Sequence, residues 1–390
     1  MIVLGLATAL LSLGATLSAA AAAPPVTPRE SAQKASSKCS NVQFTVSATA
    51  QNVKFVSPPD PKNATAILAF LGQALSTGVP TNGTQTVSGD WIINGVYCKP
   101  TVTTRPGGGG VLQFLVHGSF YDKSFWSGVG QGALYDYQAF ANLAGYHTLA
   151  IDRLGHGSNP QRPDPIDVVQ PSLGIEIIHQ IIAAIRGNTK RNALDRGFSK
   201  IAYVGHSHGS MLGQGLAARY PLDADASVLT GYSQTPNLVK FAENKLGPAA
   251  VLRPTQYAGQ PLGELVSVNG TAFIAGFYGP AGSFDAGVAR CDVAVQATTS
   301  VGELIGAQIL GPAPAYVNPL LVATGVNDNY FCATPVAACN AILANVHSAV
   351  FPNVAKFEYA AIPFTGHVMQ LSYSAPVTAL RIQLFLDKFF

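Results

Sequence analysis

The sequence is short of charged residues. Asp, Glu, Lys and Arg make up only 11% of its 390 residues, well under half of the roughly 25% that is typical of soluble domains. Lys and Arg number 23 against 20 Asp and Glu, without runs of one sign. Because no basic stripe is available to bind phosphates, we do not expect a nucleic-acid partner. The hydrophobic share of 48% excludes disorder. The length allows two to three domains, or one α/β domain with an insertion.

The first 23 residues contain no charged side chain. An apolar stretch over Ile2–Leu17 ends in the small residues Ala19–Ala23, and two prolines follow that stop any helix. This pattern predicts a secretory signal peptide at 1–23 and a flexible Ala/Pro/Ser-rich leader over 24–38. The alternative is an uncleaved membrane anchor. We expect a secreted, extracellular protein with no stable membrane insertion after signal cleavage.

Three N-glycosylation sequons agree with secretion: Asn63-Ala-Thr65, Asn82-Gly-Thr84 and Asn269-Gly-Thr271. The pattern often arises by chance, so each sequon alone is weak support. Glycosylation of Asn63, Asn82 and Asn269 is therefore a prediction that depends on export of the chain.

The five cysteines lack the CxxC spacing of redox and zinc sites, so we expect no metal. In an oxidising compartment an odd count predicts two disulfides and one free thiol. Cys332 and Cys339 are close in sequence and would close one loop. Cys39 and Cys98 would join the start of one N-terminal strand to the end of its neighbour. Cys291 would then be free.

Strand-like and helix-like segments alternate along most of the chain. Val111–Val116 is a nearly continuous apolar run, as expected of a strand buried on both faces of a parallel sheet. The alternation predicts an α/β fold with a doubly wound, mainly parallel sheet. The predicted strands are Val42–Val56, Gln85–Tyr97, Val111–Val116, Thr148–Ile151, Ile201–Val204, Val228–Thr230, Leu320–Thr324 and Phe357–Ile362. The predicted helices are Asn63–Leu75, Tyr135–Leu143, Ile175–Arg186, Met211–Tyr220 and Val377–Phe389.

The alternation breaks once, from about residue 236 to residue 314. This Gly- and Pro-punctuated stretch shows no strand rhythm and predicts a mostly helical cap, inserted between two parts of the core at 39–235 and 315–390. Loops at the carboxyl ends of parallel strands border the ligand crevice, so we expect the cap to select substrates. Phe277 and Tyr278 are candidates for substrate contact. The alternative is that the cap aromatics only pack the insertion's own small core.

One motif carries chemistry directly. The strand Ile201–Val204 runs into Gly205-His206-Ser207-His208-Gly209 and then into a helix. This is the G-x-S-x-G elbow, in which a nucleophilic serine stands on a sharp turn and the two glycines leave room for the neighbouring strand and helix. The strand–turn–helix context predicts that Ser207 is a nucleophile. The alternative is a structural turn with a spectator serine.

A second loop supplies the expected oxyanion donors. The strand Val111–Val116 ends in His117-Gly118-Ser119, and in this architecture the loop after that strand lends a backbone N–H to the oxyanion hole. We expect the two donors to be the N–H groups of Ser119 and of His208, the residue after the nucleophile. Removal of one such donor typically lowers the rate by about a hundred- to a thousandfold.

A catalytic serine needs a base and an orienting acid. His367 follows the last predicted strand, and Asp328 comes just after the strand Leu320–Thr324. We predict that His367 is the base and Asp328 the acid; the alternative for Asp328 is a simple Asx turn. The chain order Ser207, Asp328, His367 is the order that this architecture uses.

These segments closely resemble the α/β-hydrolase superfamily, of the AB hydrolase-1 type, and its secreted fungal members in particular. The resemblance covers about residues 111–390 and implies the fold and the three catalytic roles, but no substrate. Serine at position 207 argues against members that use an aspartate nucleophile, such as epoxide hydrolases. The motifs that carry the resemblance are Val116-His-Gly-Ser119, Gly145-Tyr-His-Thr148, Ala150-Ile-Asp-Arg-Leu-Gly-His-Gly-Ser158, Val204-Gly-His-Ser-His-Gly209, Leu229-Thr-Gly231, Gly325-Val-Asn-Asp328 and Gly366-His367.

The segment Asp152–Ser158 has two interpretations. His156 could lie beside the substrate, or Asp152 and Arg153 could brace the loop after a strand. We favour the structural interpretation, because the resemblance assigns this motif a structural role.

The sequence therefore predicts a secreted serine hydrolase. The most favoured reaction is hydrolysis of carboxylic esters of small hydrophobic molecules or lipids through an acyl-enzyme, with no metal or organic cofactor. Two alternatives stay open. One is a serine peptidase of the same fold, which differs in the leaving group. The other is a binding module that has lost catalysis.

Overall fold

The computed structural model describes residues 39–78, 81–100, 110–187, 193–194, 196–237, 240–241, 243–332 and 336–390. The chain divides into two units, Met1–Ser31 and Ala32–Phe390, and all described residues belong to the second. The predicted signal peptide and leader therefore lie outside the described residues. No helix within the described ranges is long and apolar enough to cross a membrane.

The centre of the fold is an eight-stranded sheet with the order β1-β2-β4-β3-β5-β6-β10-β11. Strands β4, β3, β5, β6, β10 and β11 are parallel, and β1 and β2 form an antiparallel pair at one edge. The doubly wound α/β fold is confirmed. The bounds are β1 Cys39–Phe55, β2 Thr81–Cys98, β3 Val111–Val116, β4 His147–Ile151, β5 Lys200–His206, β6 Ala226–Thr230, β10 Leu320–Gly325 and β11 Phe357–Ile362.

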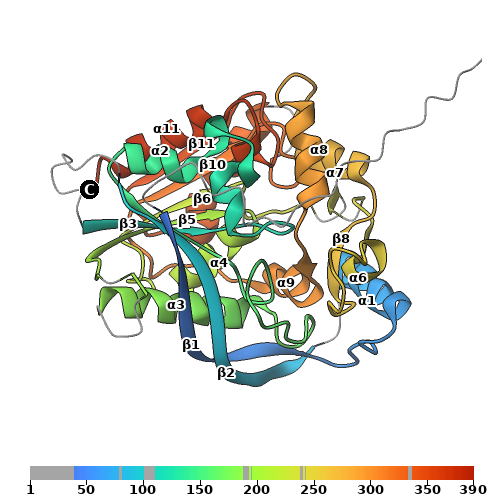
Figure 1. Cartoon of the computed structure of the whole chain (residues 1–390). Coiled ribbons are helices and arrows are strands. Elements are labelled where there is room, and N and C mark those ends of the chain that lie inside the picture. The colour runs from blue at the N-terminus through green and yellow to red at the C-terminus, as the bar shows by residue number, and fades with distance from the viewer. Residues whose placement is uncertain are drawn as a thin grey trace, which may run out of the picture. The chain divides into compact units, whose positions relative to one another are not determined.

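Helices cover both faces of the sheet (Figure 1). Successive side chains of a strand point to opposite faces, so Leu112 and Phe114 of β3 join one hydrophobic cluster, whereas Val111 and Leu115 join the other. The first cluster is shared with α3 (Pro171–Arg186), α4 (His208–Arg219) and α10 (Val336–Val350), and the second with α2 (Tyr137–Leu143) and α11 (Ala375–Leu386). This two-sided burial explains the nearly continuous apolar run of β3.

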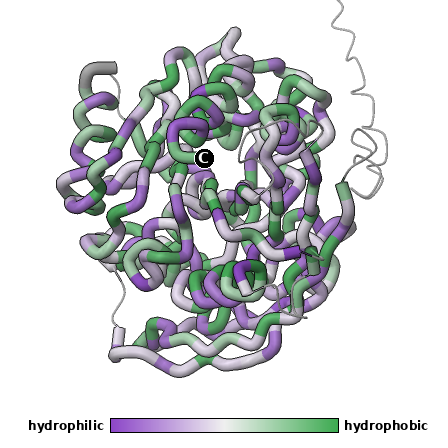
Figure 2. Tube along the Cα trace, turned by 90° about the vertical axis from the view of Figure 1, so that its left-hand side faces the viewer, coloured by the Kyte–Doolittle hydropathy of each residue, from purple (hydrophilic) through white to green (hydrophobic). Residues whose placement is uncertain are grey.

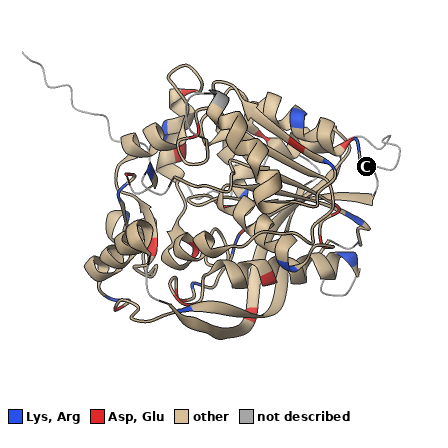
Figure 3. Ribbon diagram, turned by 180° about the vertical axis from the view of Figure 1, so that it is seen from behind, with Lys and Arg blue, Asp and Glu red and all other residues tan. Residues whose placement is uncertain are grey.

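Charged residues are sparse and scattered along the ribbon in Figure 3. Along the outer segments in Figure 2, hydrophilic residues are interspersed with hydrophobic ones and do not gather into one stripe. The view in Figure 3 agrees with the low charged fraction of 11%.

The β1–β2 ribbon is longer than the rest of the sheet. It pairs Cys39 with Cys98 at one end and Phe55 with Thr81 at the other, and only Gly95–Cys98 of β2 pairs with β4. Helix α1 (Ala64–Thr77) lies between these two strands in the chain and packs on the insertion through a separate hydrophobic cluster. The ribbon therefore carries α1 away from the sheet to the elements of the insertion.

The insertion combines helices with a small sheet that the sequence did not indicate. It contains a three-stranded antiparallel sheet of β7 (Leu246–Pro248), β8 (Glu264–Ser267) and β9 (Thr299–Ser300). These strands have two to four residues, too few for an alternating pattern to be visible in the sequence. The helices are α6 Ala249–Leu252, α7 Gly270–Phe277, α8 Ala286–Val295 and α9 Val301–Gly306, followed by the 3₁₀ turn η5 Ala307–Ile309.

Candidate active site

Ser207 occupies a strained turn between β5 and α4. Its backbone has φ 53° and ψ −117°, a region that non-glycine residues rarely adopt and that is found mainly at functional sites. The flanking glycines are required by close contacts. A Cβ on Gly205 would lie 2.6 Å from the carbonyl carbon of Gly209, and one on Gly209 would lie 2.1 Å from the carbonyl oxygen of Val116. The predicted elbow geometry is therefore present; that Ser207 is a nucleophile stays a prediction.

His367 and Asp328 meet after the ends of β11 and β10. Nδ1 of His367 lies 2.7 Å from Oδ2 of Asp328, and both side chains are buried. The other carboxylate oxygen, Oδ1, accepts the backbone N–H groups of Tyr330 and Phe331 at 2.9 and 3.1 Å. Since a carboxylate only accepts hydrogen bonds, Nδ1 carries a proton and Nε2 is left as the basic ring nitrogen. The predicted base and acid are therefore paired.

The two predicted oxyanion donors lie at the same pocket. Ser119 and His208 both line it, together with Ser207 and His367. Neither the Ser119 N–H nor the His208 N–H donates to another described residue. A Cβ on Gly118 would lie 2.8 Å from Cβ of Ser207, so the loop after β3 runs directly against the elbow. All the predicted catalytic residues except Asp328 thus line the pocket. Asp328 contacts His367 through Nδ1.

The rest of the pocket is apolar and narrow. Its free volume is about 60 Å³, room for a few water molecules or a small acyl group. Asn237 and Gln308 are the polar side chains that join the catalytic residues among its described lining. The apolar lining residues are Leu75, Met211, Pro236, Phe241, Phe277, Leu304, Ala307, Tyr330 and Phe331.

The structure separates the two cap aromatics that the sequence singled out. Phe277 lines the pocket, and its ring centroid lies 5.5 Å from that of His367. Tyr278 does not line the pocket; it is buried, and its hydroxyl donates to Asp292 at 2.8 Å. The prediction that Tyr278 contacts substrate is not supported, because α7 ends at Phe277 and the extended backbone of Tyr278 directs its side chain to Asp292.

Leu75 was missed by sequence reasoning. It comes from α1, and the long β1–β2 ribbon brings this helix to the pocket, where Leu75 lies with Leu304 and Ala307 of the insertion. No local signal in the sequence marks this residue, since its position follows from the path of the ribbon.

The histidines next to Ser207 in the sequence are buried and neutral. Burial, followed by the charge of His367, holds the pKa of His206 well below its ordinary value. His206 lies 3.1 Å through Nδ1 from the hydroxyl of Thr230 and stacks on Phe125. Burial also lowers the pKa of His208 to about 3, despite Glu303 nearby. Neither side chain competes with His367 for a serine proton.

Both predicted disulfides are present, Cys39–Cys98 and Cys332–Cys339, and Cys291 is free and exposed. The Cys39–Cys98 bond joins directly opposed residues of β1 and β2. The Cys332 N–H donates to the carbonyl oxygen of Asp328 at 3.0 Å. The second disulfide is therefore attached to the loop that carries the predicted acid.

The three sequon asparagines are exposed. Asn63 and Asn269 cap α1 and α7 by accepting backbone N–H groups through Oδ1, which leaves the amide nitrogen, the atom that a glycan would use, directed away from the cap. Glycosylation of Asn63, Asn82 and Asn269 stays a prediction.

The segment after β4 is braced as the structural interpretation expects. Asp152 accepts the Lys123 ammonium at 2.7 Å and the Ser158 N–H at 2.8 Å. Arg153 is buried and paired with Glu303 of the insertion, a partner that the sequence did not indicate.

A doubly wound sheet with a serine elbow after β5 and a His–Asp pair after β11 and β10 defines the α/β-hydrolase class. The chain belongs to the Alpha/beta hydrolase family, whose model matches residues 113–380. An esterase from Thermogutta terrifontis has a similar structure, with 14% identity and a TM-score of 0.51 over 77% of this chain and 94% of that one. An epoxide hydrolase from Vigna radiata has 14% identity and a TM-score of 0.50 over 77% and 95%. At this identity the likeness shows the fold alone. No curated protein matches the chain.

Proposed function

We propose that this protein is a secreted serine hydrolase, of the kind found in fungi, that cleaves carboxylic esters with small apolar acyl groups through an acyl-enzyme. One observation carries the proposal: Ser207, on a strained elbow with φ 53°, shares a pocket with His367, whose Nδ1 lies 2.7 Å from Asp328. A serine in this conformation, next to an oriented imidazole, suits nucleophilic attack on a carbonyl.

The proposed reaction has two halves. Oγ of Ser207 attacks the ester carbonyl carbon while Nε2 of His367 takes the hydroxyl proton, and the N–H groups of Ser119 and His208 stabilise the oxyanion. The carbon–oxygen bond to the alcohol then breaks, and the alcohol leaves with the proton from His367. Water, deprotonated by His367, attacks the acyl-enzyme in the same way, releases the acid and restores Ser207. Asp328 stabilises the imidazolium in both halves.

The pocket supports a small, uncharged acyl group as substrate. Its lining is mostly aromatic and aliphatic, and its free volume is about 60 Å³, so a charged group would lose its hydration without a partner. No Asp, Glu, Lys or Arg is among the described lining residues. A lipid-like substrate would need movement of the elements that close the pocket.

Secretion is supported by two disulfides and by three exposed sequon asparagines. Disulfides persist mainly in oxidising compartments. The uncharged apolar segment at the start of the chain is the expected export signal.

The experiment is a hydrolysis screen on purified secreted protein. The panel holds p-nitrophenyl esters of increasing acyl length and peptide amides, with Ser207→Ala as the control. The proposal expects turnover of short esters, little or none of peptide amides, and loss of turnover in the control. Preferred cleavage of amides would indicate a peptidase. Absence of both activities, with no labelling by a fluorophosphonate, would indicate a non-catalytic module.

A further inference from the structure

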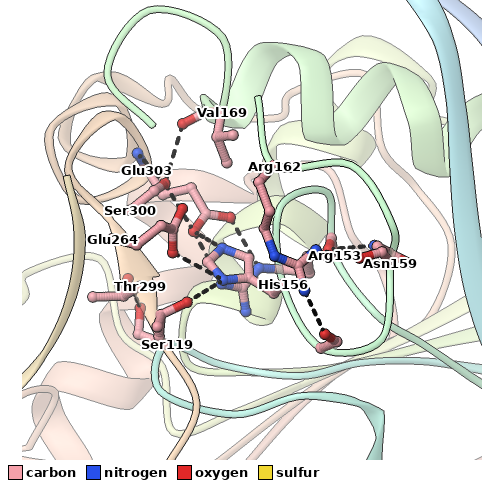
Figure 4. A network of polar contacts seen from close by, with 12 residues as sticks. Ser119, Arg153, His156, Asn159, Arg162, Val169, Glu264, Thr299, Ser300 and Glu303 are labelled. Atoms are coloured by element: carbon pink, nitrogen blue, oxygen red, sulfur yellow. Dashed lines mark hydrogen bonds and ion pairs between the residues drawn. The ribbon is translucent and has the colours of Figure 1, made fainter. Parts of the chain in front are cut away.

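A group of ionisable side chains is buried between the core and the insertion, and Figure 4 shows Arg153, His156, Glu264 and Glu303 of this group. Arg153 and His156 follow β4, His208 begins α4, and Glu264 and Glu303 belong to β8 and α9 of the insertion. Each is at most 4% exposed. In the described part of the chain, no three or more His, Cys, Asp and Glu residues are arranged to hold a metal ion. The burial of these five side chains is therefore explained by their contacts with one another.

Glu303 is the centre of this group. Its two carboxylate oxygens accept Nε and Nη2 of Arg153, each at 3.0 Å, in a bidentate pair. Nε2 of His156 lies 2.7 Å from Oε2, and Nε2 of His208 lies 3.5 Å from Oε1. Burial raises the pKa of Glu303, but the charge of Arg153, with the nearby histidines, outweighs burial and holds this pKa well below its ordinary value. Glu303 is therefore a carboxylate throughout the neutral pH range.

The remaining arm of Arg153 reaches the oxyanion loop. Nη1 donates to the carbonyl oxygen of Gly118 at 2.6 Å and to that of His117 at 2.8 Å. The backbone N–H of Arg153 donates to Nε2 of His117 at 3.1 Å. Arg153 thus fixes two successive carbonyl groups in the segment that leads to Ser119.

Because the peptide bond is planar, the contact of Arg153 with the Gly118 carbonyl also orients the N–H of Ser119. The carbonyl of Gly118 and the N–H of Ser119 belong to one peptide unit, and in a trans peptide they point in opposite directions. Because the carbonyl of Gly118 points at Arg153, the N–H of Ser119 points away from it. Ser119 lines the pocket, and this N–H donates to no other described residue.

We propose that Arg153, held by Glu303 of the insertion, is a positioning residue that orients the Ser119 N–H toward the oxyanion. Glu303 also lies against His208, the residue of the second expected donor. One carboxylate from the insertion therefore supports the Ser119 side of the oxyanion hole through Arg153, and the hole is complete only when the insertion is docked on the core. Neither Arg153 nor Glu303 lines the pocket, so both act on the transition state through the backbone. This inference rests on the proposed serine hydrolase activity.

The test compares Glu303→Gln and Arg153→Lys with wild-type protein on p-nitrophenyl acetate. Glutamine keeps the size of Glu303 but removes its charge and one acceptor site for Arg153. Lysine cannot hold the carboxylate and two carbonyl groups together. Asp292→Asn is the matched control, because Asp292 is also a buried carboxylate of the insertion and accepts hydroxyl groups of Tyr121 and Tyr278.

We expect kcat to fall by about ten- to a hundredfold in Glu303→Gln and Arg153→Lys, somewhat less than for complete removal of a donor. KM should stay within about threefold, since only transition-state binding is lost. Inhibition by phenylboronic acid, which forms a tetrahedral adduct on the serine, should weaken by the same factor as kcat/KM. Asp292→Asn should keep the wild-type kcat per folded molecule.

Three results would overturn the inference: wild-type kcat in Glu303→Gln, a rise in KM with unchanged kcat, or an equal loss in Asp292→Asn. If Arg153→Lys does not fold, Glu303→Gln decides by the same criteria. If wild-type protein hydrolyses no ester and binds no phenylboronic acid, the proposed function itself fails and the inference falls with it. An active wild type with unaffected variants refutes only the positioning role.

Discussion

Leu75 offers a sharp test of how the pocket sets acyl size, because it reaches the pocket from α1, outside the residues that match the family model. Leu75→Ala removes three carbon atoms from the wall beside Leu304 and Ala307. The side chain is only partly buried, so the loss of stability should be smaller than the about 2–5 kcal/mol of a fully buried leucine.

The gain in selectivity can be worked from the carbon atoms removed. Each buried methylene is worth about 0.8 kcal/mol, which corresponds to about a fourfold change in kcat/KM. Esters with one to three extra acyl carbons should therefore gain up to about fourfold per carbon relative to p-nitrophenyl acetate, for which kcat/KM should hardly change.

The assay is the ratio of kcat/KM along a p-nitrophenyl ester series from acetate to octanoate. Leu68→Ala is the matched control, since Leu68 lies on the same helix, is partly buried in the same cluster and does not line the pocket. A uniform change over all esters in Leu75→Ala, or an equal shift in Leu68→Ala, would refute the assignment of Leu75 to the acyl wall.

Three further predictions follow from the site. Substitution of Phe277 by leucine should change the ratio of kcat/KM values along the same ester series, because Phe277 lines the pocket. Tyr278→Phe should change kcat/KM for all esters by the same factor, because Tyr278 does not line the pocket and bonds to Asp292. The reverse pattern would contradict the assignment of Phe277 to the pocket wall. Reduction of Cys332–Cys339 should lower activity before it unfolds the protein, because Cys332 is bonded to the acid loop; loss of activity and of near-UV circular dichroism at the same reductant concentration would argue against it. The free energy of unfolding should fall as pH drops below about 6.5, since His206 and His208 have pKa values lowered by burial and take up protons only on unfolding; denaturant melts that are flat between pH 7.5 and 5 would contradict this.

The core of the fold was predictable because its strands are buried on both faces. β3, β5 and β10 are mostly apolar segments of six or seven residues in which every residue except Lys200 is buried. The elbow was predictable for a different reason. Positions 205 and 209 require glycine, because a Cβ at either position would clash with neighbouring backbone atoms.

The insertion was less predictable for a physical reason. Its strands have two to four residues and form only because they pair with neighbouring segments. They are too short for a local hydrophobic periodicity that would predict them. The same limit applies to the contact of Arg153 with Glu303, which joins residues 150 positions apart, and to Leu75, which the β1–β2 ribbon carries to the pocket. Such contacts depend on tertiary structure, and motifs at one point of the chain do not encode them.

The most direct test of the central claim is to treat the purified protein with a fluorophosphonate and to locate the adduct by peptide mass spectrometry. The account predicts a single adduct on Ser207, formed at a rate that parallels loss of ester hydrolysis, and a fall in activity of about 10⁶-fold in a folded Ser207→Ala variant, as for a triad serine elsewhere. An adduct on another residue, or ester hydrolysis that persists in Ser207→Ala, would contradict it.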